Sequence, residues 1–185
     1  RYALPLPEDA ILFVIKPRGF RTPVDPATQL PRFHRVHKPA GSPPLKYGGV
    51  PPTGPFPSPL DFPLQPQQEP ERFRAICFGD TQVRNLQEVD FLAHDIVEDL
   101  VGTDAAFGFT LGDIVFDDLS MFEPLARCIG RVGVPWYHVL GNHDEDYDAP
   151  APHQADETYE RVFGPSHYAF QYASVHFLVL RDVMW

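Results

Sequence analysis

The distribution of proline most constrains what this chain can fold into, because most of its 22 prolines lie in the first 70 residues. Proline lacks a backbone N–H donor and pushes the residue before it towards extended conformations. The stretch from Pro39 to Pro70 therefore cannot form a helix. Before it, Ala10–Ile15 and Arg32–His37 are short runs bounded by Pro and Gly, a pattern typical of strands.

These patterns divide the chain into three parts. We expect a small β-rich N-terminal module over residues 1–38, a Pro/Gly-rich extended linker over 39–71 and an α/β domain over 72–185. For the middle part, the alternative is a segment that packs on the surface of the following domain.

Strand and helix signals alternate after the linker. Short apolar runs are separated by stretches with helical periodicity, and this order predicts parallel strands joined by right-handed crossovers. The sequence therefore indicates an α/β fold. The expected strands are 74–78, 107–111, 136–140, 168–172 and 175–180, and the expected helices are 89–101, 156–163 and one from Ser120 to near Gly130 or Gly133.

Two local patterns define the first helices of this domain. Ser120, followed by Glu123 three residues later, resembles a capping box that opens a helix. In the helix over 89–101, the periodicity predicts one apolar face made of Phe91, Leu92, Ile96, Val97 and Leu100.

Composition excludes several classes of protein. A hydrophobic content of 43% is enough for a packed core, and a formal charge of −10 argues against a general nucleic-acid binder. No run is long and apolar enough to span a bilayer. Cys77 and Cys128 lie in apolar or helical patterns and predict two buried thiols. The chain does not begin with Met, so a periplasmic or secreted location stays open.

Each of the three expected parallel strands ends in a glycine followed by polar side chains. These ends are Gly79-Asp80-Thr81-Gln82, Gly112-Asp113 and Gly141-Asn142-His143-Asp144. Parallel strands place their carboxyl ends at one edge of a sheet, where α/β proteins bind ligands. Carboxylate and amide oxygens suit hard divalent ions, and imidazole extends the choice towards Mn, Fe or Zn. The sequence therefore predicts a metal site at this edge.

In this order the set resembles the calcineurin-like metallophosphoesterase superfamily. Its signature runs Asp-x-His, Gly-Asp-x-x-Asp and Gly-Asn-His-Asp/Glu, followed by a late His and Gly-His-x-His. The stretches IKPRGFRTP and HKPAGSPP are similar to bacterial members that carry a β-domain before the phosphoesterase domain. The resemblance implies a calcineurin-like sheet with helices, preceded by a small β-rich module.

The resemblance also implies roles for the residues. Asp80 would bind the first metal, Asp113 would bridge two ions, Asn142 would bind the second, and His143 would act as acid or stabiliser of the leaving group. The implied cofactors are two divalent ions (Mn, Fe, Zn or Mg). The implied reaction is hydrolysis of a phosphoester by a water that the two metals activate.

Two positions depart from the signature. Gln82 stands where the family has His, and its amide oxygen is a weaker ligand for Zn or Fe. Asp117 lies one place beyond the usual spacing after Asp113, so a solvated loop carboxylate is the alternative to a partner of His143. Asp117 and Asp144 are the candidates for groups that support the ligands from behind.

Nothing after Asn142 supplies the late histidines of the signature. We therefore expect the chain to hold the first part of the domain, truncated before those motifs, and to be nearly inactive alone. Phosphomonoester, phosphodiester and pyrophosphate remain equally open as substrates. One alternative is a non-catalytic protein whose β-module binds a ligand such as a glycan beside a vestigial metallo-domain. Another is a single structural cation site.

Overall fold

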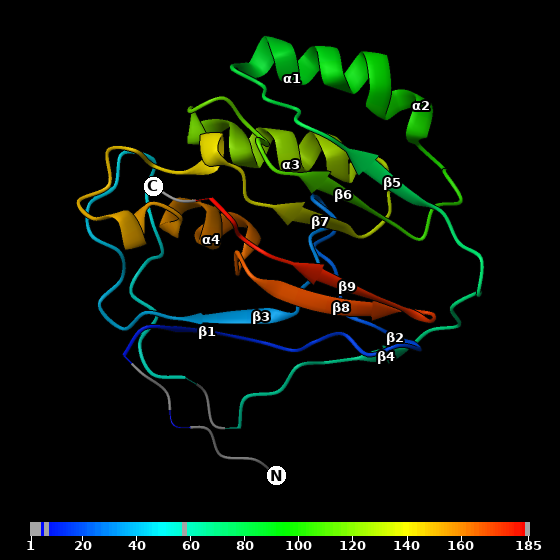
Figure 1. The fold of residues 1–185 in the computed structure, drawn as a ribbon, viewed down its shortest axis with the longest axis horizontal. Coiled ribbons are helices and arrows are strands. Elements are labelled where there is room, and N and C mark those ends of the chain that lie inside the picture. Colours follow the sequence, from blue (N-terminus) through cyan, green and yellow to red (C-terminus); the bar gives the residue numbers. More distant parts are fainter. Residues whose placement is uncertain (1–4, 6–7, 57–58, 184–185) are drawn as a thin grey trace.

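The computed structural model describes residues 5, 8–56 and 59–183, so the ends of the expected N-terminal and C-terminal parts and residues 57–58 lie outside it. Its centre is a parallel sheet of three strands in the order β5-β6-β7 (Figure 1). The strands are β5 (Ala75–Phe78), β6 (Phe107–Leu111) and β7 (Trp136–Val139). Both pairings are parallel, as the sequence predicted, and the chain is mixed α/β.

Helices connect these strands and lie on one side of the sheet (Figure 1). Between β5 and β6 run α1 (Leu86–Leu92), a π-helical segment η1 (Ala93–Val97) and α2 (Glu98–Leu100). Between β6 and β7 run η2 (Leu119–Met121) and α3 (Phe122–Gly130). Their apolar side chains pack against Trp136 and Leu140 in a single buried cluster.

The predicted apolar face of the first helix is wrong in part. The side chains buried in this helix are Val89, Ala93 and Val97, which are spaced four residues apart. Phe91 and Ile96 are 55% and 42% exposed. Helical neighbours on one face are three or four residues apart. Because the row through Val89 and Val97 faces α3, Phe91 and Ile96 point away from α3. The helix also contains the π-helical segment at its centre, which periodicity did not indicate.

The start of the next helix also differs from the prediction. Ser120 does not form a capping box with Glu123. The carboxylate of Asp118 instead accepts hydrogen bonds from the backbone N–H of Ser120 (3.1 Å) and from its hydroxyl (2.6 Å). Asp is as good an N-cap as Ser, so the turn begins two residues earlier than expected.

Only one of the two cysteines is buried. Cys128 lies in the core on α3, and its thiol donates to the backbone carbonyl of Val89 at 3.7 Å. Cys77 on β5 is exposed, so the prediction of two buried thiols is wrong for Cys77, and both residues are free thiols. β5 is an edge strand of the sheet, which leaves its alternate side chains uncovered.

The first segment of the chain forms two small antiparallel sheets. β1 (Ala10–Phe13) pairs with β3 (His34–His37), and β2 (Phe20–Arg21) pairs with β4 (Gln65–Pro66). This segment lies against the rest of the protein, because Phe33 packs in a cluster with aromatic residues of β6, β7 and the C-terminal hairpin. The expected strands are therefore present.

The chain after β7 forms short helices and a hairpin. These elements are η3 (Asn142–Asp144), η4 (Pro152–Gln154), α4 (Glu157–Phe163), β8 (Tyr168–Tyr172) and β9 (Val175–Val179). β8 and β9 are antiparallel and lie on the side of the sheet opposite α1–α3 (Figure 1). Among the helices of the described ranges, none has the length and apolar character to cross a membrane.

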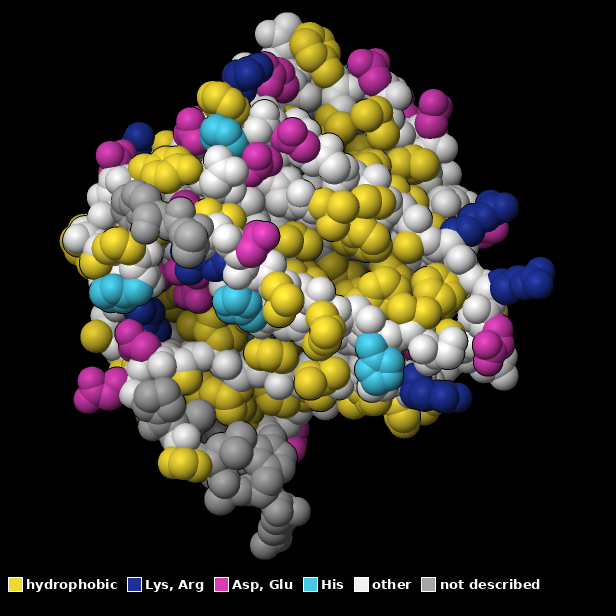
Figure 2. Space-filling view, in the orientation of Figure 1, with side chains coloured by type: hydrophobic (Ala, Val, Ile, Leu, Met, Phe, Trp, Pro, Cys, Tyr) yellow, Lys and Arg dark blue, Asp and Glu magenta, His cyan; other side chains and the backbone are white. Residues whose placement is uncertain are grey.

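Hydrophobic side chains are exposed where the hairpin meets the central sheet. Leu111, Leu178 and Leu180 are 53%, 72% and 67% exposed. They line a groove of about 300 Å³ between β6, β7 and the β8-β9 hairpin. In Figure 2 hydrophobic side chains gather broadly over this face of the molecule. The hairpin therefore covers this face of the sheet only in part.

The buried imidazole of His138 makes stability depend on pH. Burial lowers the pKa of His138 from 6.5 to about 3, and both ring nitrogens are buried without a hydrogen-bond partner. Below pH 6.5 the unfolded chain takes up a proton that the folded chain does not, so stability falls as the pH falls towards 3. Between pH 7.5 and 5 this one residue should lower the free energy of unfolding by about 2 kcal/mol.

Urea unfolding at both pH values tests this. His138→Leu should reduce the acid-induced loss of stability by about that amount. The exposed His153, replaced by glutamine, is the control. An equal loss in parent and His138→Leu would contradict the prediction.

Candidate metal centre

The loops that follow β5, β6 and β7 converge on the carboxylate of Asp113. Its Oδ2 accepts a hydrogen bond from the Gln82 amide at 3.1 Å, and its Oδ1 accepts one from the backbone N–H of His143 at 3.2 Å. The backbone N–H of Gln82 also donates to the Asp113 carbonyl at 2.9 Å. The structure thus brings Gln82, Asp113 and His143 together at the predicted edge.

The backbone is strained at this edge. Asp80, Gln82, Asp113 and Asp117 have φ values of 57°, 40°, 44° and 62°. These are four of the six non-glycine residues with positive φ that the described part of the chain contains. Each such conformation costs about 1–3 kcal/mol, and such residues cluster at functional sites.

Gly141 is required at its position by close approach rather than by its φ. A Cβ atom there would lie 2.1 Å from both the backbone nitrogen and Oδ1 of Asp113. Any larger residue would push the third loop away from Asp113. The glycine before Asn142 therefore sets how closely the loops after β6 and β7 approach each other.

Asp144 joins the same two loops from beneath. It is fully buried, and its carboxylate accepts backbone hydrogen bonds from Gly141 (2.8 Å), Ile114 (3.1 Å) and Val115 (3.1 Å). Burial raises the pKa of Asp144 to about 7, although the three N–H donors favour the charged form. Asp144 therefore holds the loops after β6 and β7 together from beneath this edge.

His143 is held on two sides. Its Nδ1 lies 2.8 Å from Oδ1 of Asp117, and its ring stacks on Phe116 with centroids 4.5 Å apart and planes 21° apart. The hydrogen bond to Asp117 raises the pKa of His143. Despite its shifted spacing, Asp117 contacts His143, because its left-handed backbone turns the chain back towards that residue.

Two aromatic contacts at this edge were missed from the sequence. The guanidinium carbon of Arg84 lies 4.6 Å from the centroid of Phe116, which itself contacts His143. The hydroxyl of Tyr147 donates to the backbone carbonyl of Asn142 at 2.7 Å. Arg84 follows Gln82 by two residues, and Phe116 follows Asp113 by three. This closeness to the motifs was the only signal in the sequence that could have indicated them.

Asp80 and Asn142 lie at the exposed rim of the edge. Neither side chain makes a hydrogen bond within the described residues, so their oxygens are available to a cation. The side-chain NH₂ of Gln82 donates to Asp113. Rotating the amide group of Gln82 by 180° would exchange its nitrogen and oxygen, so that the oxygen could bind a cation.

The side-chain oxygens of Asp80, Gln82, Asp113 and Asn142 are the type of ligand that a hard divalent ion prefers. They are too few to hold two such ions. Four oxygen-donor side chains fill fewer than half of the roughly twelve ligand positions of two six-coordinate ions, so the set is incomplete for two ions. Within the described ranges there is no group of three or more His, Cys, Asp or Glu side chains arranged to hold a metal ion.

Comparison of the chain with protein-family models, curated proteins and solved structures finds no match.

Removing the Asp144 carboxylate should destabilise the protein strongly. Asp144→Ala would leave three buried backbone N–H groups without acceptors, at a cost of about 3 kcal/mol or more. Asp148→Ala is the matched control, because Asp148 is exposed and forms only a surface ion pair with Lys46 at 3.2 Å. It should change stability by less than about 0.5 kcal/mol in urea unfolding. Equal effects of the two substitutions would contradict this role for Asp144.

Proposed function

We propose that the chain is part of a calcineurin-like metallophosphoesterase that hydrolyses a phosphoester with two divalent ions. The observation that carries this proposal is the pairing of His143 with Asp117 at the edge where Gln82 and Asp113 meet. Asp117 is half-exposed, as a solvated loop carboxylate would be, and its position 2.8 Å from this imidazole supports a role as the partner of His143.

The ligand roles follow the order of the loops. Asp80 and Gln82 would hold the first ion, Asn142 the second, and Asp113 would lie between them, with Mn, Fe, Zn or Mg as the candidate metals. Bound ions would lower the pKa of a water and neutralise the phosphoryl oxygens. Asp113 is suited to the bridging role because both of its oxygens already face neighbouring loops.

His143 is suited to protonate or stabilise the departing oxygen. The hydrogen bond to Asp117 raises the pKa of His143, which favours the charged form that can donate a proton. Asp117 and the Phe116 ring together fix the plane of the imidazole. The other ring nitrogen, Nε2, would then be the atom that meets the substrate.

Manganese binding tests the proposal without depending on turnover. Mn²⁺ titration followed by electron paramagnetic resonance should show binding that Asp113→Asn weakens by about tenfold or more, since the central carboxylate is lost. The control is Asp118→Asn, which alters a carboxylate of the same loop that caps η2. Asn also caps helices, so this variant should fold and bind Mn²⁺ normally. No difference between the two variants would refute the proposed site.

Activity gives a second measurement. With Mn²⁺ and p-nitrophenyl phosphate or bis(p-nitrophenyl) phosphate, the 185-residue chain should turn over close to background, because its donors are too few for two ions. Rapid hydrolysis would contradict the expectation of an incomplete ligand set.

A further inference from the structure

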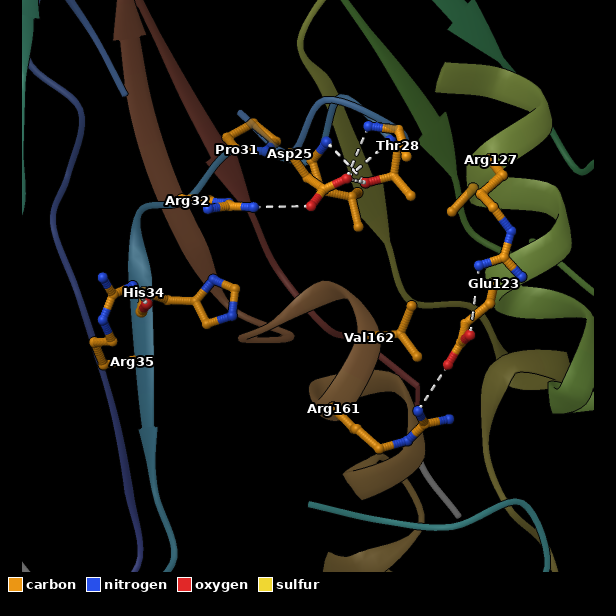
Figure 3. Close-up of a pocket in the computed structure, with 13 residues that line it drawn as sticks. Asp25, Thr28, Pro31, Arg32, His34, Arg35, Glu123, Arg127, Arg161 and Val162 are labelled. Atoms are coloured by element: carbon orange, nitrogen blue, oxygen red, sulfur yellow. Dashed lines mark hydrogen bonds and ion pairs between the residues drawn. The ribbon is translucent and has the colours of Figure 1, made fainter. Parts of the chain in front are cut away.

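Apart from the candidate metal centre, a polar pocket lies between the N-terminal segment and the helices α3 and α4. Its volume is about 430 Å³, and none of the metal-centre residues lines it. Figure 3 shows the charged groups around it. They are Asp25, Arg32, Arg35, Glu123, Arg127 and Arg161, and the ring of His34 also lines the pocket.

One wall is a loop organised by Asp25. Oδ1 of this carboxylate accepts hydrogen bonds from the backbone of Ala27 (3.0 Å) and of Thr28 (3.1 Å), while Oδ2 accepts one from Arg32 at 2.9 Å. The loop also packs closely on the end of α3, since a Cβ at Gly130 would lie 2.5 Å from the Ala27 carbonyl. This wall is therefore fixed in place, with the Arg32 guanidinium at its rim.

The opposite wall is an ion-paired cluster on two helices. Glu123 of α3 lies 2.9 Å from Arg161 of α4 and 3.7 Å from Arg127, one turn further along α3. The side chain of Arg127 is 57% exposed, and its distance from Glu123 is long for a hydrogen bond. Most of the five donors of Arg127 are therefore available to a ligand.

His34 projects from β3 towards the space between these walls (Figure 3). Its Nδ1 is buried and has no hydrogen-bond partner. The ring is also fixed, because a Cβ at Gly164 would lie 2.4 Å from it. Burial lowers the pKa of His34 to about 4, so the ring is neutral near pH 7. His34 therefore contributes a fixed, neutral imidazole to the lining of the pocket.

The charge of the pocket contrasts with that of the chain. Four arginines and two carboxylates line the pocket, whereas the chain as a whole carries −10. One of the four, Arg35, donates to the backbone carbonyl of His34 at 2.8 Å. Leu30, Ala126 and Val162 supply apolar surface within the same pocket.

We propose that this pocket binds a small organic anion, whose carboxylate or phosphate group is held by Arg127, with the Arg32 guanidinium on the opposite wall. Guanidinium groups match the paired oxygens of both anions. The apolar part of the ligand would lie against Leu30, Ala126 and Val162, and Asp25 and Glu123 keep the arginines in position. This site is independent of the proposed hydrolysis.

Succinate and inorganic phosphate are the two probes, titrated separately by isothermal calorimetry at about 10 mM ionic strength, where screening is weak. Passing the protein and the buffers over a chelating resin beforehand removes metal-dependent anion binding without adding a competing carboxylate. We expect saturable binding of at least one probe, and Arg127→Gln should weaken it by about tenfold, since a charge-assisted contact is lost. Binding of succinate alone would identify a carboxylate ligand, and binding of phosphate alone a phosphate ligand.

Two variants make the result specific. Arg131→Gln removes an equally exposed arginine at the end of α3 that pairs with Glu98 at 3.3 Å, outside the pocket, and should bind like the parent. Asp113→Asn should also bind like the parent, which separates this site from the metal centre. Failure of both probes to saturate, or equal affinity of Arg127→Gln and Arg131→Gln, would overturn the proposal. Circular dichroism confirms that each variant is folded.

Discussion

The candidate centre depends on one buried carboxylate. Asp144 accepts backbone hydrogen bonds from the loop after β6 and from the loop after β7, and so fixes the distance between Asp113 and His143. A surface salt bridge could not do this, because exposed pairs contribute little and tolerate movement. Here three backbone N–H groups donate to one buried carboxylate. If the loops separated, these polar groups would lose their partners, which is costly in the interior. The polar edge is therefore rigid before any cation binds.

Rigidity explains how the strain at this edge is tolerated. Positive φ values at Asp80, Gln82 and Asp113 are unfavourable for residues with a Cβ. They persist because the parallel pairing of β5 with β6 continues beyond the strands, through the bridge between Val83 and Val115. The hydrogen bonds around Asp113 and Asp144 then leave the loops no relaxed alternative. Oxygen donors held in this way are suited to an ion, since little ordering remains to be done on binding.

The sequence was informative where one local signal decides the structure and silent where packing decides it. The three strands and their common edge followed from apolar runs ending in Gly and a polar residue, as at Gly112-Asp113. The buried face of the first helix was mispredicted in part, because α3 selects the row through Val89, which only the tertiary contact defines. The partner of His143 was ambiguous for a related reason. Spacing argued against Asp117, and only its left-handed backbone brings it to the imidazole.

The N-terminal segment matters to more than its own small sheets. Lys16 is 5% exposed and its ammonium lies 2.7 Å from Glu69, whose other oxygen accepts from the backbone of Gly19 and of Ala173, each at 2.8 Å. This buried network joins the segment, the end of the proline-rich stretch and the β8-β9 hairpin. Breaking a buried pair is costly, so the segment is held against the sheet. The polar pocket proposed to bind an anion exists only in that docked arrangement. One of its walls belongs to the N-terminal segment, and the other belongs to α3 and α4. A ligand held between these two walls would therefore bind only the docked form and stabilise it.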